Sequence, residues 1–138
     1  MKAFFDNNTS PRLATTLHGY ISHDGHEAWH MSKYPHLLNG RRSTDIEWIE
    51  HLRAGKDWVF FTRDRRILKN KAEKSALKAS NLTGFIFASG FEKMPQNEFA
   101  ALLLFRWPEI EQLFKTVTPL IYELPATRNG RLRPIFSY

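Results

Sequence analysis

The chain has 138 residues, a length typical of one domain with a sizeable core, and 42% of them are hydrophobic, which excludes a disordered protein. It contains no cysteine, which excludes a disulfide framework, a cysteine nucleophile and a cysteine-based zinc site. Its 20 basic and 14 acidic residues give a formal charge of +6, which favours a polyanion such as nucleic acid as partner. We also expect a cytoplasmic protein with no membrane partner, because no apolar run reaches the ~20 residues of a membrane span and no signal peptide is visible.

Apolar runs and helix-start signals alternate along the chain. Strands are expected over residues 2–5, 25–31, 57–62, 84–89 and 119–124, and helices over 11–19, 44–55, 65–79 and 95–117. Pro108 is expected to interrupt or restart the last helix. The alternation predicts one α/β domain over residues 1–138, a three-layer sandwich with a mainly parallel sheet of about five strands. A basic tail is expected at about 126–138.

Local signals mark the starts of the first two helices. Ser10 followed by Pro11 is a typical helix start, with serine as N-cap and proline at the first helical position. Thr44 and Glu47 have the spacing of a capping box at the start of the second helix. The buried stripe of that helix is expected to be its aliphatic residues Ile46, Ile49 and Leu52.

Three aspartates stand where the predicted sheet ends. Asp6 directly follows the first strand, Asp64 follows the third strand by two residues, and Asp45 lies in the first turn of the helix after the second strand. Because the carboxyl ends of parallel strands share one edge, we expect these carboxylates to converge there, where open α/β sheets bind ligands. Converging carboxylates repel one another unless a cation lies between them, and Mg²⁺ or Mn²⁺ is typically held by carboxylates and substrate phosphates. We therefore predict that the three aspartates are metal-binding, catalytic residues that serve in-line phosphodiester hydrolysis.

Basic residues border this predicted site. Seven lysines and arginines lie between residues 63 and 78, against two acids. Such a density of positive charge is typical of a nucleic-acid-binding surface, although a solvated helix face has the same appearance. The predicted nucleic-acid-binding residues are Arg63, Arg65, Arg66, Lys69, Arg12, Arg41 and Arg42.

Structural roles compete with these assignments. Asp6 is able to start an Asx-turn, Asp45 to complement the helix dipole, and Asp64 to cap the next helix and pair with Arg66. Glu47 lies about 200° around the helix from Asp45, so it is assigned to the cap and not to the metal.

Two other classes of protein remain open. One is a non-catalytic module that binds nucleic acid or an acidic protein through the basic segment. The other is a structural subunit whose aromatic helix "FAALLLFRW" packs on a partner. Four histidines within 14 residues (His23, His26, His30 and His36) make a zinc site conceivable, but no tight His-x-x-x-His helix supports it.

The same residues carry a family resemblance. "FFDNNTSPRLATTL" and "STDIEWIEHLRAGKDWVFFTRD" resemble the PIN-like nuclease fold, in particular the short PIN-like proteins related to VapC-type toxins. Members show an Asp at the end of the first strand, an Asp opening a middle helix, and "TRD" after the next strand. The resemblance implies a ribonuclease with Mg²⁺ or Mn²⁺ held by Asp6, Asp45 and Asp64. It also implies a toxin with RNA as substrate and a small antitoxin protein as partner, and a homodimer is compatible with that role.

The chain departs from the family pattern at two places. Asn7 stands where many relatives have an acid beside the first Asp. Larger PIN domains also place a Glu on a helix between the first two aspartates. The only acids in that interval are Asp24 and Glu27.

Overall fold

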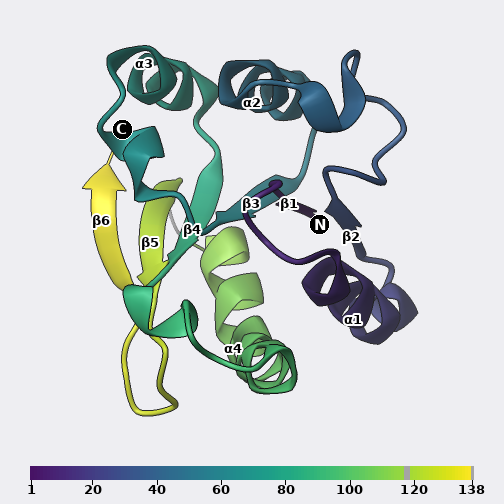
Figure 1. Ribbon diagram of the computed structural model, residues 1–138, viewed down its shortest axis with the longest axis vertical. Coiled ribbons are helices and arrows are strands. Elements are labelled where there is room, and N and C mark those ends of the chain that lie inside the picture. The colour runs from purple at the N-terminus through teal and green to yellow at the C-terminus, as the bar shows by residue number, and fades with distance from the viewer. Residues whose placement is uncertain (117–118, 138) are drawn as a thin grey trace.

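A central sheet forms the middle layer of the protein, in a computed structural model that describes residues 1–116 and 119–137. Within those residues the sheet has six strands in the order β2-β1-β3-β4-β5-β6. The first five strands are parallel, and β6 runs antiparallel to β5 (Figure 1). The strands are β1 (Lys2–Phe5), β2 (Glu27–His30), β3 (Trp58–Thr62), β4 (Thr83–Phe87), β5 (Leu120–Leu124) and β6 (Arg133–Ser137). The predicted parallel α/β sheet is confirmed.

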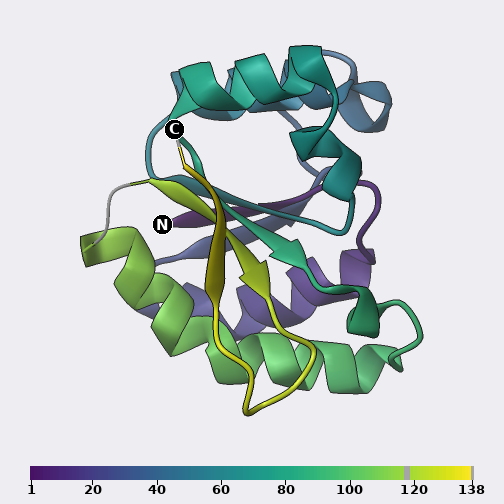
Figure 2. The same ribbon diagram turned by 90° about the vertical axis from the view of Figure 1, so that its left-hand side faces the viewer.

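Helices cover both faces of the sheet, as Figure 2 shows. One face carries α1 (Pro11–Ile21) and α4 (Gln96–Thr116), and the other carries α2 (Asp45–Ala54) and α3 (Lys71–Ser80). The described connections contain four short 3₁₀ helices: η1 (Ser22–Asp24), η2 (Gly40–Arg42), η3 (Arg65–Leu68) and η4 (Ser89–Phe91). Among the described residues, no helix combines the length and apolar character needed to cross a membrane.

Alternating phenylalanines build a separate core on each face. Phe5 and Phe61 stack at 4.7 Å between ring centroids beneath α1 and α4, whereas Phe4 and Phe60 pack under α2 and α3. Gly84 in β4 makes room for the Phe60 ring, because a Cβ there would lie only 2.1 Å from Phe60 Cζ. The consecutive apolar residues of β3 are thus explained by burial on both faces.

The basic segment after β3 is not one helix, so the prediction of a helix over 65–79 is wrong in its extent. It consists of η3 followed by α3, with a break at Lys69 and Asn70. Asn70 causes the break, since its side chain accepts a hydrogen bond of 3.0 Å from the Glu73 N–H and thereby caps α3. The break moves Glu73 from the middle of a predicted helix into the first turn of a real one.

Pro108 lies inside one continuous helix, so the predicted interruption is also wrong. Trp107 and Ile110 on either side of it are buried against the sheet, and this packing holds the helix together across the proline. Val117, the last residue of that predicted helix, lies outside the described residues. Most large apolar residues of α4 face the protein's own core, although 49% of Phe105 is exposed.

Two further expectations need correction. In α2 the buried stripe is Trp48, Ile49 and Leu52, while Ile46 is 39% exposed, because the tryptophan side chain takes the place beneath the helix. The predicted basic tail contains the strand β6, which completes the sheet beside β5. Tyr138, the last residue of that tail, lies outside the described residues.

Candidate active site at the carboxyl end of the sheet

Asp6 is a buried carboxylate at the end of β1, with only 3% of the residue exposed. The Thr62 hydroxyl donates a hydrogen bond of 2.5 Å to its Oδ2, and the Asn8 N–H donates one of 3.2 Å to its Oδ1. The second bond closes the Asx-turn that the sequence suggested. Asp6 is therefore held in one orientation by the neighbouring strand and by its own turn.

The charge of Asp6 is unfavourable in this fold. The pKa of Asp6 is raised to about 7, mainly by burial and in addition by the carboxylates of Asp45 and Asp64, against the lowering effect of the hydrogen bonds from Thr62 and Asn8. These two carboxylates act on Asp6 because the parallel sheet brings the ends of β1 and β3 and the start of α2 to one edge. The three aspartates thus lie close enough at this edge for Asp45 and Asp64 to act electrostatically on Asp6, while their role as one metal site stays a prediction.

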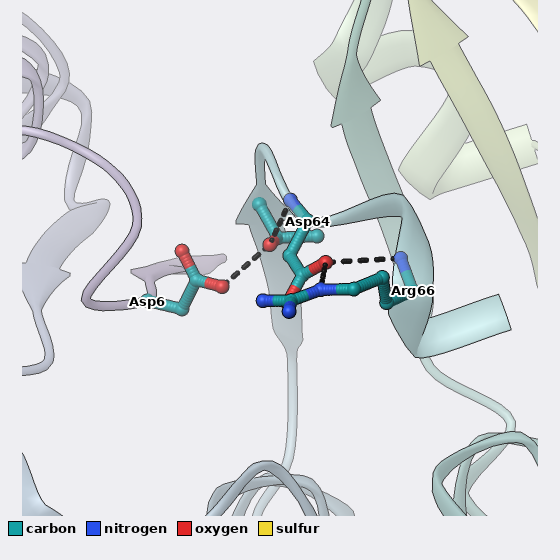
Figure 3. Close-up of polar contacts among 4 residues, drawn as sticks. Asp6, Asp64 and Arg66 are labelled. Atoms are coloured by element: carbon teal, nitrogen blue, oxygen red, sulfur yellow. Dashed lines mark hydrogen bonds and ion pairs between the residues drawn. The ribbon is translucent and has the colours of Figure 1, made fainter. Parts of the chain in front are cut away.

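Asp64 lies near Asp6, and its carboxylate forms an ion pair with Arg66 (Figure 3). Its N–H donates to the same Thr62 hydroxyl at 3.0 Å, so one threonine positions both acids. Arg66 donates its Nε to Asp64 Oδ1 at 2.9 Å and an Nη to Oδ2 at 3.1 Å, and its backbone N–H is capped by Asp64. These bonds lower the pKa of Asp64. The Arg66 side chain is 82% exposed, so it is able to leave the carboxylate without disturbing the core.

Glu73 is a fourth acid at this edge, and it is not among the predicted site residues. Burial raises the pKa of Glu73, and the carboxylates of Asp45 and Asp64 raise it further. Asp45, at the start of α2, also accepts a hydrogen bond of 2.9 Å from Trp48 Nε1. The signal that marks Glu73 is Asn70 three residues before it, since this pair has the spacing of a helix N-cap followed by an acid in the first turn.

The four acids have the chemistry of a site for a hard divalent cation. Carboxylate oxygens are the preferred ligands of Mg²⁺ and Mn²⁺, and a bound cation would offset both the burial and the mutual repulsion that raise the pKa of Asp6. Within residues 1–116 and 119–137, no group of three or more acidic or histidine side chains is placed so that it could hold a metal ion. The four acids suit such a cation by their chemistry, but as placed here they do not form a ligand group, and Asp64 is paired with Arg66.

The predicted basic residues are distributed around this edge in different ways. Arg63, Asp64 and Arg66 line a cavity of about 350 Å³ together with Asn8 and Glu92. Arg65 does not line this cavity and forms an ion pair with Glu123 of β5. The remaining ones, Lys69, Arg12, Arg41 and Arg42, are exposed.

Asn7 links the loop before α2 to the site. Its Nδ2 donates to the carbonyl of Arg41 at 2.5 Å, which fixes η2 next to the end of β1. The position where many relatives carry an acid thus serves here as a tether for a basic loop.

Other candidates do not join the site. The Glu47 N–H donates to the Thr44 hydroxyl, which is the Thr44 half of the predicted capping box, while the Glu47 side chain accepts a hydrogen bond of 2.6 Å from Asn39 Nδ2. His26 pairs with Glu111 at 2.9 Å, and His30 contacts the carbonyl of Thr9 at 2.8 Å. These two histidines are thus held by partners in separate places, and no set of histidines assembles for zinc in the described part of the chain.

Comparison with known proteins points to one family. A family model described as "PIN like domain" matches residues 1–89, which is well over half of the chain and includes all four acids. No curated protein and no solved structure matches the chain. The matched segment runs from β1 through β4 to the first residue of η4, and it leaves α4, β5 and β6 outside.

Proposed function

The chain belongs to the PIN-like domain family, and from that premise we propose that it is a metal-dependent ribonuclease that hydrolyses phosphodiester bonds of RNA. PIN-like domains are generally nucleases, and the nucleases among them generally use divalent metals. The choice of RNA, and of Mg²⁺ or Mn²⁺, belongs to the proposal.

One observation carries it: Asp6 is buried beside Asp45 and Asp64 although its charge is unfavourable there. A fold under selection for stability alone would gain by replacing such a carboxylate, so its position favours a role in binding or catalysis. The arginines that border it, Arg63 and Arg66, supply the positive charge needed to hold a phosphodiester.

Each residue of the site would have a distinct role in binding the cation or the phosphate. Asp6, Asp45, Asp64 and Glu73 would hold the cation, which when bound activates water and neutralises charge on the phosphate. Thr62 keeps Asp6 and Asp64 in register with each other through its hydroxyl. When substrate binds, Arg66 would leave Asp64 and pair with a substrate phosphate. Asp64 would then be free to bind the cation.

The proposal includes the role of a toxin that is restrained by a small antitoxin. Its support is the resemblance of "FFDNNTSPRLATTL" and the "TRD" segment to the short PIN-like proteins related to VapC-type toxins. The net charge of +6 agrees with an RNA substrate and with an acidic partner.

Asp64→Asn tests the catalytic role. Purified protein is incubated with structured and single-stranded RNA in Mn²⁺, Mg²⁺ or EDTA, beside the variant and the control Asp24→Asn, which changes an exposed aspartate of η1. We expect cleavage that needs metal, a loss on the order of 100-fold or more in Asp64→Asn, and none in the control. Equal cleavage by all three proteins would identify a contaminant.

The same panel distinguishes the non-catalytic binding module. A binder that uses the basic segment would not cut RNA, and Asp64→Asn would bind RNA as well as or better than the parent because a negative charge is removed. Glu73→Gln adds a second readout: if Glu73 helps to hold the cation, this variant needs more Mn²⁺ for half-maximal cleavage, whereas Asp24→Asn does not.

A further inference from the structure

We infer that Arg65 and Arg133, held together by Glu123, form a phosphate-binding pair that extends the RNA path from the acidic site onto the hairpin of β5 and β6. The inference rests on the proposed function, because it takes RNA as the ligand. It assigns a binding role to a part of the chain that lies beyond the family match to residues 1–89.

The pair is built from three segments far apart in the sequence. Glu123 of β5 pairs through Oε2 with Arg65 of η3 and through Oε1 with Arg133 of β6, the latter at 2.9 Å. Glu123 and Arg133 are also register partners across the antiparallel strands. The Glu123 side chain is only 16% exposed, whereas those of Arg65 and Arg133 are 44% and 67% exposed.

This arrangement presents positive charge to the solvent. One carboxylate balances only one of the two guanidinium groups, so the trio keeps a net charge of +1. Each guanidinium carries five N–H donors, and those not used by Glu123 remain available to a phosphate oxygen. Because Glu123 already fixes both arginines, little side-chain freedom is lost when a phosphate binds.

The pair is continuous with the acidic site. Arg65 stands between Asp64 and Arg66 in sequence, and Arg66 lines the cavity of the site. Glu123 lies near the carboxyl end of β5, which is parallel to the strands that carry Asp6 and Asp64, so it belongs to the same edge of the sheet. RNA bound at the acids therefore meets Arg65 and Arg133 next.

The loop that joins β5 to β6 is held in place and carries more positive charge. The buried Arg106 of α4 donates Nη2 to the carbonyls of Thr127 and Arg128, the first at 2.8 Å, and also to that of Gly130. Exposed arginines at 128 and 131 lie on this fixed loop. Since phosphates are contacted repeatedly along a single strand, a rigid basic loop after the pair suits single-stranded RNA.

Binding of a single-stranded RNA oligonucleotide of mixed sequence, measured by fluorescence anisotropy in EDTA, tests the inference on the full chain. Arg133→Gln is compared with Arg53→Gln, which removes the same charge from an exposed position in the last turn of α2. We expect Arg133→Gln to weaken binding about fivefold and to reduce the salt slope by ~0.7, while Arg53→Gln changes the affinity less than twofold.

Glu123→Gln separates positioning from simple charge. It raises the net charge by one, so charge alone predicts tighter binding of RNA. If Glu123 positions the two arginines, binding becomes weaker instead. Arg133→Lys keeps the charge without the forked geometry and should restore only part of the affinity. Circular dichroism confirms that each variant is folded.

The outcomes also separate this inference from the proposed function. It is overturned if Arg133→Gln matches Arg53→Gln, if Glu123→Gln binds more tightly, or if the parent does not bind RNA. An equal loss of affinity for polyglutamate would reassign the pair to an acidic protein. If the variants rank in RNA affinity as expected but the parent never cuts RNA in Mn²⁺, the arginine pair is supported and the ribonuclease proposal fails. If the parent cuts RNA but the variants do not rank as expected, the ribonuclease proposal stands and the arginine pair fails.

Discussion

The amino ends of the parallel strands meet in a cluster of aromatic rings, whereas their carboxyl ends meet in a cluster of carboxylates. At the amino end, the ring centroids of Trp58 and Tyr34 lie 5.4 Å apart, and Lys2 Nζ lies 4.8 Å from the centroid of the Trp58 ring. The Tyr34 hydroxyl lies 3.0 Å from His51 Nε2. These polar groups have favourable partners, and the interactions at this edge support the fold.

The carboxyl end has the opposite character. Asp6 is buried at a cost, and its neighbours Asp45 and Asp64 increase that cost. Binding and catalytic sites commonly lower the stability of a protein, because their side chains are positioned for a ligand and not for the most favourable contacts in the fold. The comparison therefore predicts that changes at the amino end lower stability and spare cleavage, whereas changes at the carboxyl end remove cleavage and spare or raise stability.

Trp58→Ala should have the largest effect on stability. Trp58 is 5% exposed and packs on Phe4 and Tyr34, so its loss leaves a cavity and should lower the free energy of unfolding by about 3–5 kcal/mol. Denaturant unfolding followed by far-ultraviolet circular dichroism measures it. Tyr20→Ala, which changes an aromatic residue that is 58% exposed, should stay within about 0.5 kcal/mol of the parent. Equal effects of the two changes would mean that the aromatic cluster does not support the fold.

Asp6→Asn should raise stability at pH 8 in EDTA. The folded parent keeps the Asp6 proton up to a pKa of about 7, whereas the unfolded chain releases it near 3.8. The folded state therefore binds more protons in this window, and the free energy of unfolding falls as pH rises from about 4 to about 7. The full shift corresponds to roughly 4 kcal/mol. Asn also loses one acceptor for the Asn8 N–H, so we expect a net gain of about 1–3 kcal/mol.

Unfolding curves of both proteins between pH 5 and 9 test this expectation. Burial also lowers the pKa of His30 and of His51, and these groups favour the folded state as pH rises. Because both proteins share these histidines, the difference between the two curves isolates Asp6. The variant should become relatively more stable up to about pH 7 and should not cleave RNA. A variant less stable than the parent at pH 8 would show that Asp6 supports the fold.

The parts of the fold that follow from local signals were predictable. Apolar runs gave the five parallel strands, caps at Ser10 and Thr44 gave two helix starts, and the parallel order placed Asp6 and Asp64 together. Glu73 could not be placed while the segment around it was taken as one helix, because only the break before α3 brings it to the edge.

Contacts between segments far apart in the sequence could not be predicted. Strand β6 pairs with β5 through a bulged register, and its sequence begins with Arg133 and Pro134, which favours a tail over a strand. The contacts of Glu123 with Arg65 and Arg133 join residues up to 58 positions apart, and no local pattern encodes them.

Tyr34→Phe should have the smallest effect and tests the comparison most finely. It removes the hydroxyl that contacts His51 and keeps the ring that packs against Trp58, so the free energy of unfolding should fall by about 0.5–1.5 kcal/mol. Tyr20→Phe, on an exposed side chain, should change it by less. RNA cleavage in Mn²⁺ should be unchanged in both variants, since neither side chain lies at the edge that holds the acids. A loss of cleavage in Tyr34→Phe alone would mean that the aromatic edge contributes to the active site, and the division of the sheet into a stabilising end and a functional end would then be wrong.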